Sequence, residues 1–221
     1  MPTLTRDGSI WTIDLGADEN RFSPGHLHEL GRILDDVRSS TEPAAVVTTG
    51  TGKFFSNGLD LDHLAGQPEA LMPYVDRIHH LLGAFLTLPV PTVAAVNGHA
   101  FGAGAMLALA HDYRVMRSDR GYFCLPEVDI HIPFTAGMAS LIQSKTSART
   151  AVDAMTTGRR FGAEDALAAG LVDLVADLDQ LPEAAADLVR DLAGKDRATL
   201  SAIKATMFAS TVVALEPAAP A

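Results

Sequence analysis

The sequence has one cysteine, few aromatic residues and no long apolar segment. Cys124 alone cannot form an intrachain disulfide or a cysteine-cluster zinc site, and this cysteine usage favours a reducing, cytoplasmic location. Aromatic residues make up 6% of the chain, which argues against base-stacking platforms for nucleic acid. The longest apolar runs fall well short of the roughly 20 residues that cross a bilayer. We therefore expect no nucleic-acid partner and no membrane partner.

Positive charge and several catalytic motifs are scarce or missing as well. The chain has 17 Lys and Arg against 27 Asp and Glu, a net charge of −10 at pH 7. An anionic ligand must therefore be met by local cations or by backbone N–H groups. The sequence contains no G-x-S-x-G elbow, no H-E-x-x-H pair and no Gly-Lys-Ser/Thr phosphate loop. We expect no metal site, no serine hydrolase of that type and no P-loop nucleotide site.

Short apolar segments of strand type alternate with segments of helix type, and no internal sequence repeat is evident. This alternation predicts an α/β fold with largely parallel strands. The strands are expected at 10–15, 44–49, 91–97, 112–116, about 121–124 and 171–175. Helices are expected at 24–38, 69–88, from Gly98 to about 110, 135–157, 163–169 and 179–210.

Unusual residues stand where three of these strands end, at 50–60, 97–104 and 124–129, and ligands of α/β folds gather at strand ends. The turn Asn57-Gly58 either presents the N–H of Leu59 to a ligand oxygen or forms a surface loop. The glycine-rich stretch at 98–104 opens an apolar helix. It either packs a helix closely on a strand or aims backbone N–H groups at developing negative charge.

The third junction carries a carboxylate, Glu127, directly after a proline at the end of an apolar segment. Glu127 could be an ordinary surface carboxylate or the cap of a turn. Alternatively, it lies in an apolar pocket, where desolvation raises its pKa and makes it a usable base. Asp129 would share the side of Glu127 if this segment were extended. We rank it second, as a structural hydrogen-bond acceptor.

Taken in order, four segments resemble the crotonase superfamily, the enoyl-CoA hydratase/isomerase group. They are GKFFSNGLDL (52–61), PTVAAVNGHAFGAGAMLALAHDYRV (91–115), the PEV turn (126–128) and TTGRRFGAEDALAAGLVD (156–173). The resemblance implies an α/β fold, a spiral of ββα turns followed by C-terminal helices. It predicts a core domain at 1–176, a helical region at 177–213 and a flexible tail at 214–221. It also predicts a homo-oligomer, a trimer or a hexamer.

The same resemblance implies an acyl-CoA thioester as the ligand, with no cofactor beside it. The backbone N–H groups of Leu59 and Ala103 match the pair that holds the thioester oxygen. Hydratases of the family carry two glutamates, and here Met106 stands at the first position and Glu127 at the second. By similarity, further substrate contacts fall on Arg21, Phe22, Asn57, Leu61 and Lys204.

A single carboxylate favours the Δ3,Δ2-enoyl-CoA isomerase branch. Glu127 would take a proton from C2 of a 3-enoyl-CoA and return it to C4, a step of fatty acid β-oxidation. The alternatives are an enoyl-CoA hydratase or another acyl-CoA lyase or hydrolase of the family. A further alternative is a non-catalytic acyl-CoA-binding relative. Glu127 counts against the last, because a carboxylate between apolar flanks is costly to bury without a purpose.

Overall fold

A computed structural model describes residues 1–64 and 68–216, and two β-sheets form its frame. The larger sheet has antiparallel β1 and β2 at one edge and is parallel from β2 onward. Its strands, in spatial order, are β1 (Thr3–Asp7), β2 (Ile10–Asp14), β3 (Ala45–Thr49), β5 (Thr92–Val96), β7 (Tyr113–Arg117) and β10 (Leu174–Ala176). The smaller sheet contains β4 (Phe54–Ser56), β6 (His99–Phe101), β8 (Phe123–Cys124) and β9 (Arg160–Phe161).

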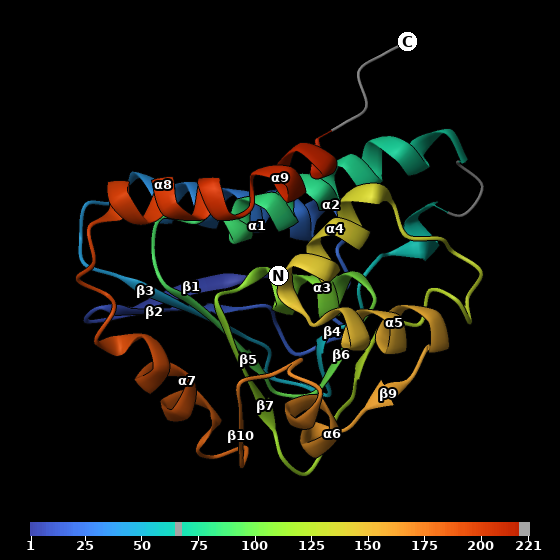
Figure 1. Cartoon of the computed structure of the whole chain (residues 1–221). Helices are drawn as coiled ribbons and strands as arrows, with labels where there is room; N and C mark the ends of the chain where they lie inside the picture. The colour runs from blue at the N-terminus through green and yellow to red at the C-terminus, as the bar shows by residue number, and fades with distance from the viewer. Residues whose placement is uncertain (65–67, 217–221) are drawn as a thin grey trace.

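The chain visits the two sheets in turn, and each pair of strands is followed by a helix. The three units are β3–β4–α2, β5–β6–α3 and β7–β8–α4, with α2 at Leu71–Leu86, α3 at Ala103–Ala110 and α4 at Ala136–Lys145. Two short 3-10 turns, Leu61–Leu64 and Pro68–Ala70, lie between β4 and α2. The predicted spiral of ββα turns is confirmed (Figure 1).

Alternating side chains of the larger sheet supply two apolar clusters, as the two-residue period of a strand requires. On one face, Val47, Val93 and Val115 pack against α7 (Leu181–Arg190). On the other face, side chains of the same strands join the core formed with α1 (Pro24–Ser39), α2 and α3. The members of that second set include Trp11, Ile13, Val46, Ala94, Val96 and Met116. A sheet buried on both faces explains why its strands look continuously apolar in the sequence.

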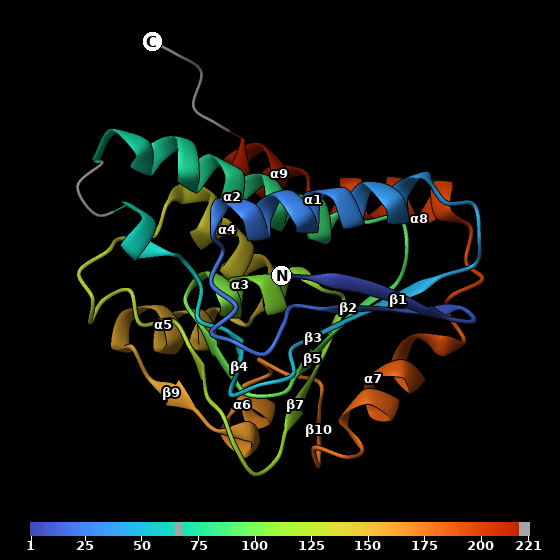
Figure 2. The same ribbon diagram turned by 180° about the vertical axis from the view of Figure 1, so that it is seen from behind.

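Helix α1 begins where Ser23 and Pro24 predict it. The Ser23 hydroxyl accepts a hydrogen bond from the N–H of His26, and Pro24 occupies the first helical position, where no N–H is needed. The structure ends the helix at Ser39, one residue beyond the expected boundary. Figures 1 and 2 show α1, α2, α8 and α9 along one side of the molecule, with α7 on the opposite side of the larger sheet.

Three expected helices need correction. The segment after Gly98 first forms strand β6, and the helix starts only at Ala103, because 99–101 pair with both β4 and β8. The expected helix at 135–157 is two helices, α4 and α5 (Ala148–Thr157), since Ser147 caps a new start by accepting from Thr150 N–H. The expected helix at 179–210 is also divided. Its first part is α7, and a new helix begins after Asp196, whose side chain accepts from Thr199 N–H.

The C-terminal helices complete the fold. They are α6 (Ala163–Ala168), α7, α8 (Arg197–Met207) and α9 (Ala209–Leu215). Residues 214 and 215 of the expected tail belong to α9, and 217–221 lie outside the described residues. No single described helix is long and apolar enough to cross a bilayer, and α8 with α9 reaches that length and composition only when joined across a 74° bend.

Candidate active site

A cavity of about 560 Å³ lies where the three expected junctions meet. It is lined by the turns after β4, β6 and β8, by the N-terminal turn of α2 and by the segment leading into α4. The turn residues are Asn57, Leu59, Gly102, Ala103 and Glu127. Most of the remaining wall is apolar. A mostly apolar hollow with a few convergent polar groups is what a small-molecule site requires.

The turn at 56–59 is held in place by the chain between β2 and α1. The Ser56 hydroxyl donates to the carbonyl of Asn20, and Asn57 N–H donates to the carbonyl of Glu19. Phe22 N–H donates to the carbonyl of Gly58 at 2.9 Å. These bonds fix the backbone immediately before Leu59, so its N–H has a set direction.

The turn also packs directly on the start of α3, without a side chain between them. Gly58 has φ +78°, and a Cβ there would lie 2.7 Å from the Phe101 carbonyl and 3.0 Å from the Ala103 nitrogen. A Cβ at Gly104 would lie 2.3 Å from the Ser56 carbonyl oxygen. Both positions therefore require glycine. The close approach answers why an apolar helix begins with so many small residues.

The N–H groups of Leu59 and Ala103, both at this contact, have no hydrogen-bond partner among the described residues. Ala103 is the first residue of α3, where an N–H has no partner within the helix. Both residues line the cavity. The arrangement supplies two backbone donors at a helix N-terminus, where the helix dipole favours negative charge.

Glu127 brings a carboxylate into the same cavity. It is only 7% exposed, and its Oε2 atom has no hydrogen-bond partner among the described residues. A Cβ at Gly102 would lie 3.3 Å from its Oε1 atom, so the carboxylate is next to the start of α3. Desolvation by burial raises the pKa of Glu127 from 4.5 to about 7. A carboxylate with such a pKa both accepts and releases protons near neutral pH.

Met106 faces the cavity from α3 and is almost completely buried. Among the described residues that line the cavity, Glu127 is the only carboxylate. Cys124 also lines the wall, but burial raises the pKa of its thiol to about 11, so it is neutral. The cavity therefore offers one group that can exchange protons near neutral pH.

Asp129 does not share the side of Glu127, because the segment is not extended. Asp129 N–H and Ile130 N–H both donate to the Pro126 carbonyl, which makes a turn. The Asp129 carboxylate lies against Gly158, where a Cβ would be 2.2 Å from it, and it does not line the cavity. The backbone of the turn thus separates the two carboxylates.

Of the five other expected substrate contacts, two line the cavity and three do not. Asn57 and Leu61 line the cavity. Arg21 does not, and its guanidinium pairs with Glu19 and Asp62 at 2.5 Å each.

Phe22 and Lys204 are also away from the cavity lining. The Phe22 side chain is 0% exposed in the core, so only its backbone supports the site. Lys204 is 4% exposed, and its ammonium group donates to Asp112 at 2.6 Å and to the Val90 carbonyl at 2.9 Å. A ligand contact by the Phe22 ring would need the core to open, and one by Lys204 would need this ion pair to break.

Two residues that hold the site escape the sequence patterns. Asn20 adopts φ +50° and donates from its side chain to three carbonyls, those of Gly16, Phe54 and Phe55. The Tyr74 hydroxyl accepts from Asp60 N–H and donates to the Phe22 carbonyl. Asparagine tolerates the left-handed region, which is the only local hint for Asn20. Nothing near Tyr74 in the sequence points to its partners.

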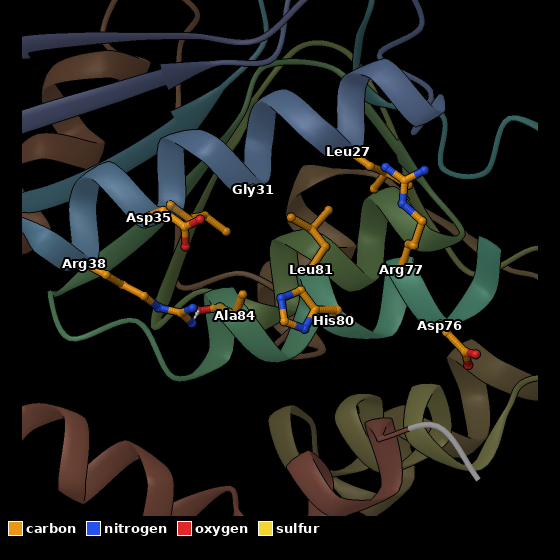
Figure 3. A pocket seen from close by; sticks show the side chains of 10 residues that line it. Leu27, Gly31, Asp35, Arg38, Asp76, Arg77, His80, Leu81 and Ala84 are labelled. Atoms are coloured by element: carbon orange, nitrogen blue, oxygen red, sulfur yellow. Dashed lines mark hydrogen bonds between the residues drawn. The ribbon is translucent and has the colours of Figure 1, made fainter. Parts of the chain in front are cut away.

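The other hollows lie away from the three junctions, and of the expected site residues only Lys204 lines one of the larger ones. One, of about 280 Å³, lies between α1 and α2, where Asp35 and Asp76 mix with Arg38 and Arg77 (Figure 3). Arg38 donates to the Ala84 carbonyl across it. Among the described residues no three His, Cys, Asp or Glu side chains come together in a way that could hold a metal ion.

Comparison with known proteins gives consistent matches over nearly the whole chain. Residues 5–219 match the enoyl-CoA hydratase/isomerase family. Enoyl-CoA delta isomerase 3 of Arabidopsis thaliana is 38% identical over 207 residues, covering 88% of this chain and 86% of that protein. Carnitinyl-CoA dehydratase of Shigella flexneri is 35% identical, covering 91% of this chain and 77% of that protein.

Solved structures share the fold at lower identity. A probable enoyl-CoA hydratase of Mycobacterium tuberculosis superimposes with a TM-score of 0.90 at 26% identity, over 97% of this chain and 91% of the other. A second structure of the same Mycobacterium tuberculosis protein, named there as an enoyl-CoA isomerase, gives 0.88 at 27% identity, over 97% and 93%. The chain thus belongs to the enoyl-CoA hydratase/isomerase family, the crotonase superfamily, and within it to the isomerase branch.

Proposed function

We propose that this protein converts 3-enoyl-CoA to 2-trans-enoyl-CoA, with Glu127 as the only proton shuttle. The observation that carries the proposal is the single carboxylate in the described wall of the cavity, beside two unpartnered backbone N–H groups. The similarity to three plant enoyl-CoA delta isomerases supports the same reaction.

The thioester carbonyl oxygen would accept hydrogen bonds from the N–H groups of Leu59 and Ala103. Removal of a proton from C2 turns this carbonyl into an enolate, so charge appears on the oxygen during the reaction. Donors already aimed at that oxygen stabilise the transition state more than the substrate. Their value is large because the surrounding wall is mostly apolar and excludes water.

Glu127 would then act twice. Its carboxylate takes the C2 proton, which leaves a dienolate delocalised over the thioester and the double bond. The resulting carboxylic acid returns a proton to C4, so the double bond moves to the 2,3 position and the base is regenerated. The pKa of about 7 makes both transfers accessible near neutral pH. The reaction takes up no water and exchanges no electrons, so we propose that no cofactor is needed beside the CoA thioester.

Hydration is the runner-up, and the similarity to carnitinyl-CoA dehydratases is the observation in its favour. Hydration places a water between two carboxylates. Here Met106 stands at the first of these positions in α3, and its thioether cannot activate water. The apolar side chain therefore favours proton transfer within the substrate over addition of water.

The cellular setting belongs to the proposal. We place the reaction in fatty acid β-oxidation, where a 3-enoyl-CoA has to be shifted before the next step. The cytoplasmic location and the trimer or hexamer stay predictions, and two of the plant relatives are named as peroxisomal proteins. The Lys204 contact with CoA also stays a prediction, against which the ion pair with Asp112 counts.

The test is a paired assay in H₂¹⁸O with a 3-enoyl-CoA and crotonyl-CoA as substrates. We expect 2-trans-enoyl-CoA from the first, without ¹⁸O, and little 3-hydroxyacyl-CoA from the second. Glu127→Gln should lower kcat by about 10³-fold, within the 10²–10⁴-fold range of general acid–base catalysis.

Asp129→Asn is the matched control, because it removes a nearby carboxylate that does not line the cavity. It should keep the wild-type rate within about twofold. Rapid formation of ¹⁸O-labelled 3-hydroxyacyl-CoA would mean that the enzyme hydrates its substrate, and it would overturn the isomerase proposal. Full activity of Glu127→Gln would remove Glu127 from the mechanism.

A further inference from the structure

A second cavity of about 520 Å³ lies under α8, remote in sequence from the β4, β6 and β8 turns of the active site. It is lined by α8, the segment between α7 and α8, the start of β7 and the end of α4. Its volume falls in the roughly 300–1,000 Å³ range of small-molecule sites. The apolar part of its wall consists of Pro91, Leu192, Leu200, Ile203, Met207 and Phe208.

Charged groups at one end of this cavity leave one cation in excess. Lys204 pairs with Asp112 at 2.6 Å, and Arg114 pairs with Asp173 at 3.1 Å. Lys145 is the third cation, and among the described residues its ammonium group makes no ion pair and no hydrogen bond. Its contact is the Phe208 ring, whose centroid is 5.2 Å from Nζ. A partly buried charge is normally paired, and this one has only an aromatic face and the partial charges at the end of α4.

Two further features suit an anion beside Lys145. The Tyr113 hydroxyl lines the same cavity, and it too has no hydrogen bond to another described residue. Asp112 is already occupied, because its Oδ2 atom accepts from Thr92 N–H, from the Thr92 hydroxyl and from Lys204. The neighbouring carboxylate is thus held by other donors, and the positive end of the cavity is free to hold a carboxylate from outside.

We propose that this cavity is a binding site for an amphipathic monocarboxylate, a free fatty acid, with the carboxylate on Lys145 and the chain along the apolar wall. The site is separate from the catalytic cavity, and the proposal does not depend on the reaction catalysed there. The chemistry follows from the two halves of the cavity. An apolar ligand would leave the ammonium group unpaired, and a small inorganic anion would leave the apolar wall unfilled.

The charge of Lys145 makes the binding depend on pH. Desolvation and the like charges of Arg114 and Lys204 lower its pKa to about 8, while Asp112 and Asp173 act in the opposite direction. The mouth of the cavity adds Lys195 and Asp196, which are exposed and opposite in sign. A bound carboxylate stabilises the ammonium form. Affinity is therefore greatest below pH 8 and falls about tenfold between pH 7 and pH 9, as the free amine loses its proton.

The experiment is isothermal titration of the full-length protein with decanoate at pH 7. Decanol, which has the chain without the charge, and acetate, which has the charge without the chain, are the comparison probes. We expect decanoate to bind at least about tenfold more tightly than either, because only decanoate uses both halves of the cavity.

Two variants and one control locate the site. Lys145→Gln should weaken decanoate at least about tenfold, whereas Lys145→Arg keeps the charge and should stay within about threefold. Ile203→Asp should weaken it as well, by placing a negative charge on the wall at a residue that is 49% exposed and therefore tolerant of change. All three should keep the wild-type rate with enoyl-CoA. Equal decanoate affinity in wild type and Lys145→Gln, an affinity that does not change between pH 7 and pH 9, or no binding at millimolar decanoate would each overturn the proposal.

Discussion

Glu127 in the catalytic cavity and Lys204 beneath α8 are both buried charged side chains, but only Lys204 has a counter-ion. Lys204 is buried with Asp112 as its counter-ion. Glu127 is buried almost as deeply, with no ion pair among the described residues and one oxygen unpartnered. A buried pair holds elements together, whereas a buried single charge costs stability and keeps a proton available. The Lys204–Asp112 pair therefore serves the structure, whereas the unpaired Glu127 is suited to proton transfer.

Breaking the pair should have the largest effect on stability. Lys204→Met leaves Asp112 without its counter-ion, and we expect the free energy of unfolding to fall by about 3 kcal/mol. Urea denaturation measures this fall. Lys195→Met, which removes an exposed lysine at the mouth of the same cavity, should change stability by less than about 0.5 kcal/mol. If both variants lost the same stability, the Asp112 pair would contribute nothing specific.

Removing the unpaired carboxylate of Glu127 should raise the free energy of unfolding, the opposite of the effect expected for Lys204→Met. Burial raises the pKa of Glu127 from 4.5 to about 7, so the carboxylate ionises more easily in the unfolded chain than in the folded one. The stability of the wild type is therefore greatest below pH 4.5 and falls as pH rises through 7. Glu127→Gln avoids this loss and should be more stable at pH 8, by up to about 3 kcal/mol. Melting curves of both proteins at pH 5 and pH 8 should diverge only at the higher pH.

The catalytic activity should depend on the ionisation of Glu127. The base must be ionised to take the C2 proton, so kcat/KM should rise with pH and level off above about pH 7. Between pH 7 and pH 5 it should fall about 50-fold, because the base is half ionised at pH 7 and about 1% ionised at pH 5. Lys145→Gln serves as the control and should leave the profile unchanged. A profile that bends near pH 4.5 instead would mean that Glu127 is not desolvated.

A second carboxylate in the cavity should have the smallest of these effects, a shift in the pH dependence of activity. Met106→Glu places a like charge on the wall opposite Glu127, which disfavours ionisation of both. The acidic limb of the kcat/KM profile should move upward by about one pH unit. Met106→Gln, which is polar but uncharged, should leave it in place. The same pair of variants, assayed with crotonyl-CoA, reports whether the second carboxylate allows water to be activated.

The sequence predicts the fold class and the three junctions that line the cavity, but not every boundary of the elements between them. The three strand-end junctions carry short-range chemistry in turn glycines and a proline beside Glu127, and the structure brings them to one cavity. Strand β6 is predicted as helix, because its strand character comes from pairing with β4 and β8, which are distant along the chain. The repeating ββα unit leaves no sequence repeat, since its strands share only burial and length.

Long-range partners explain the other differences. Lys204 looks like a surface cation until Asp112, 92 residues earlier, is known to be its neighbour. Phe22 is an aromatic residue at a helix start, and only the packed core shows that its ring is inside while its backbone holds the Gly58 turn. No pattern along the chain reports either contact.

The contact between the Gly58 turn and α3 also bears on how the family can change its substrates. The two donors at that contact are main-chain groups, and their positions come from strand pairing and from the missing Cβ atoms of Gly58 and Gly104. A different side chain at Leu59 therefore need not move the donors, whereas Ala103 is 2% exposed in the apolar core and has little room to change. Under the proposed function, the cavity wall at Leu59 can change while its main-chain donor stays in place, so substrate range and chemistry are set by separate atoms of one residue.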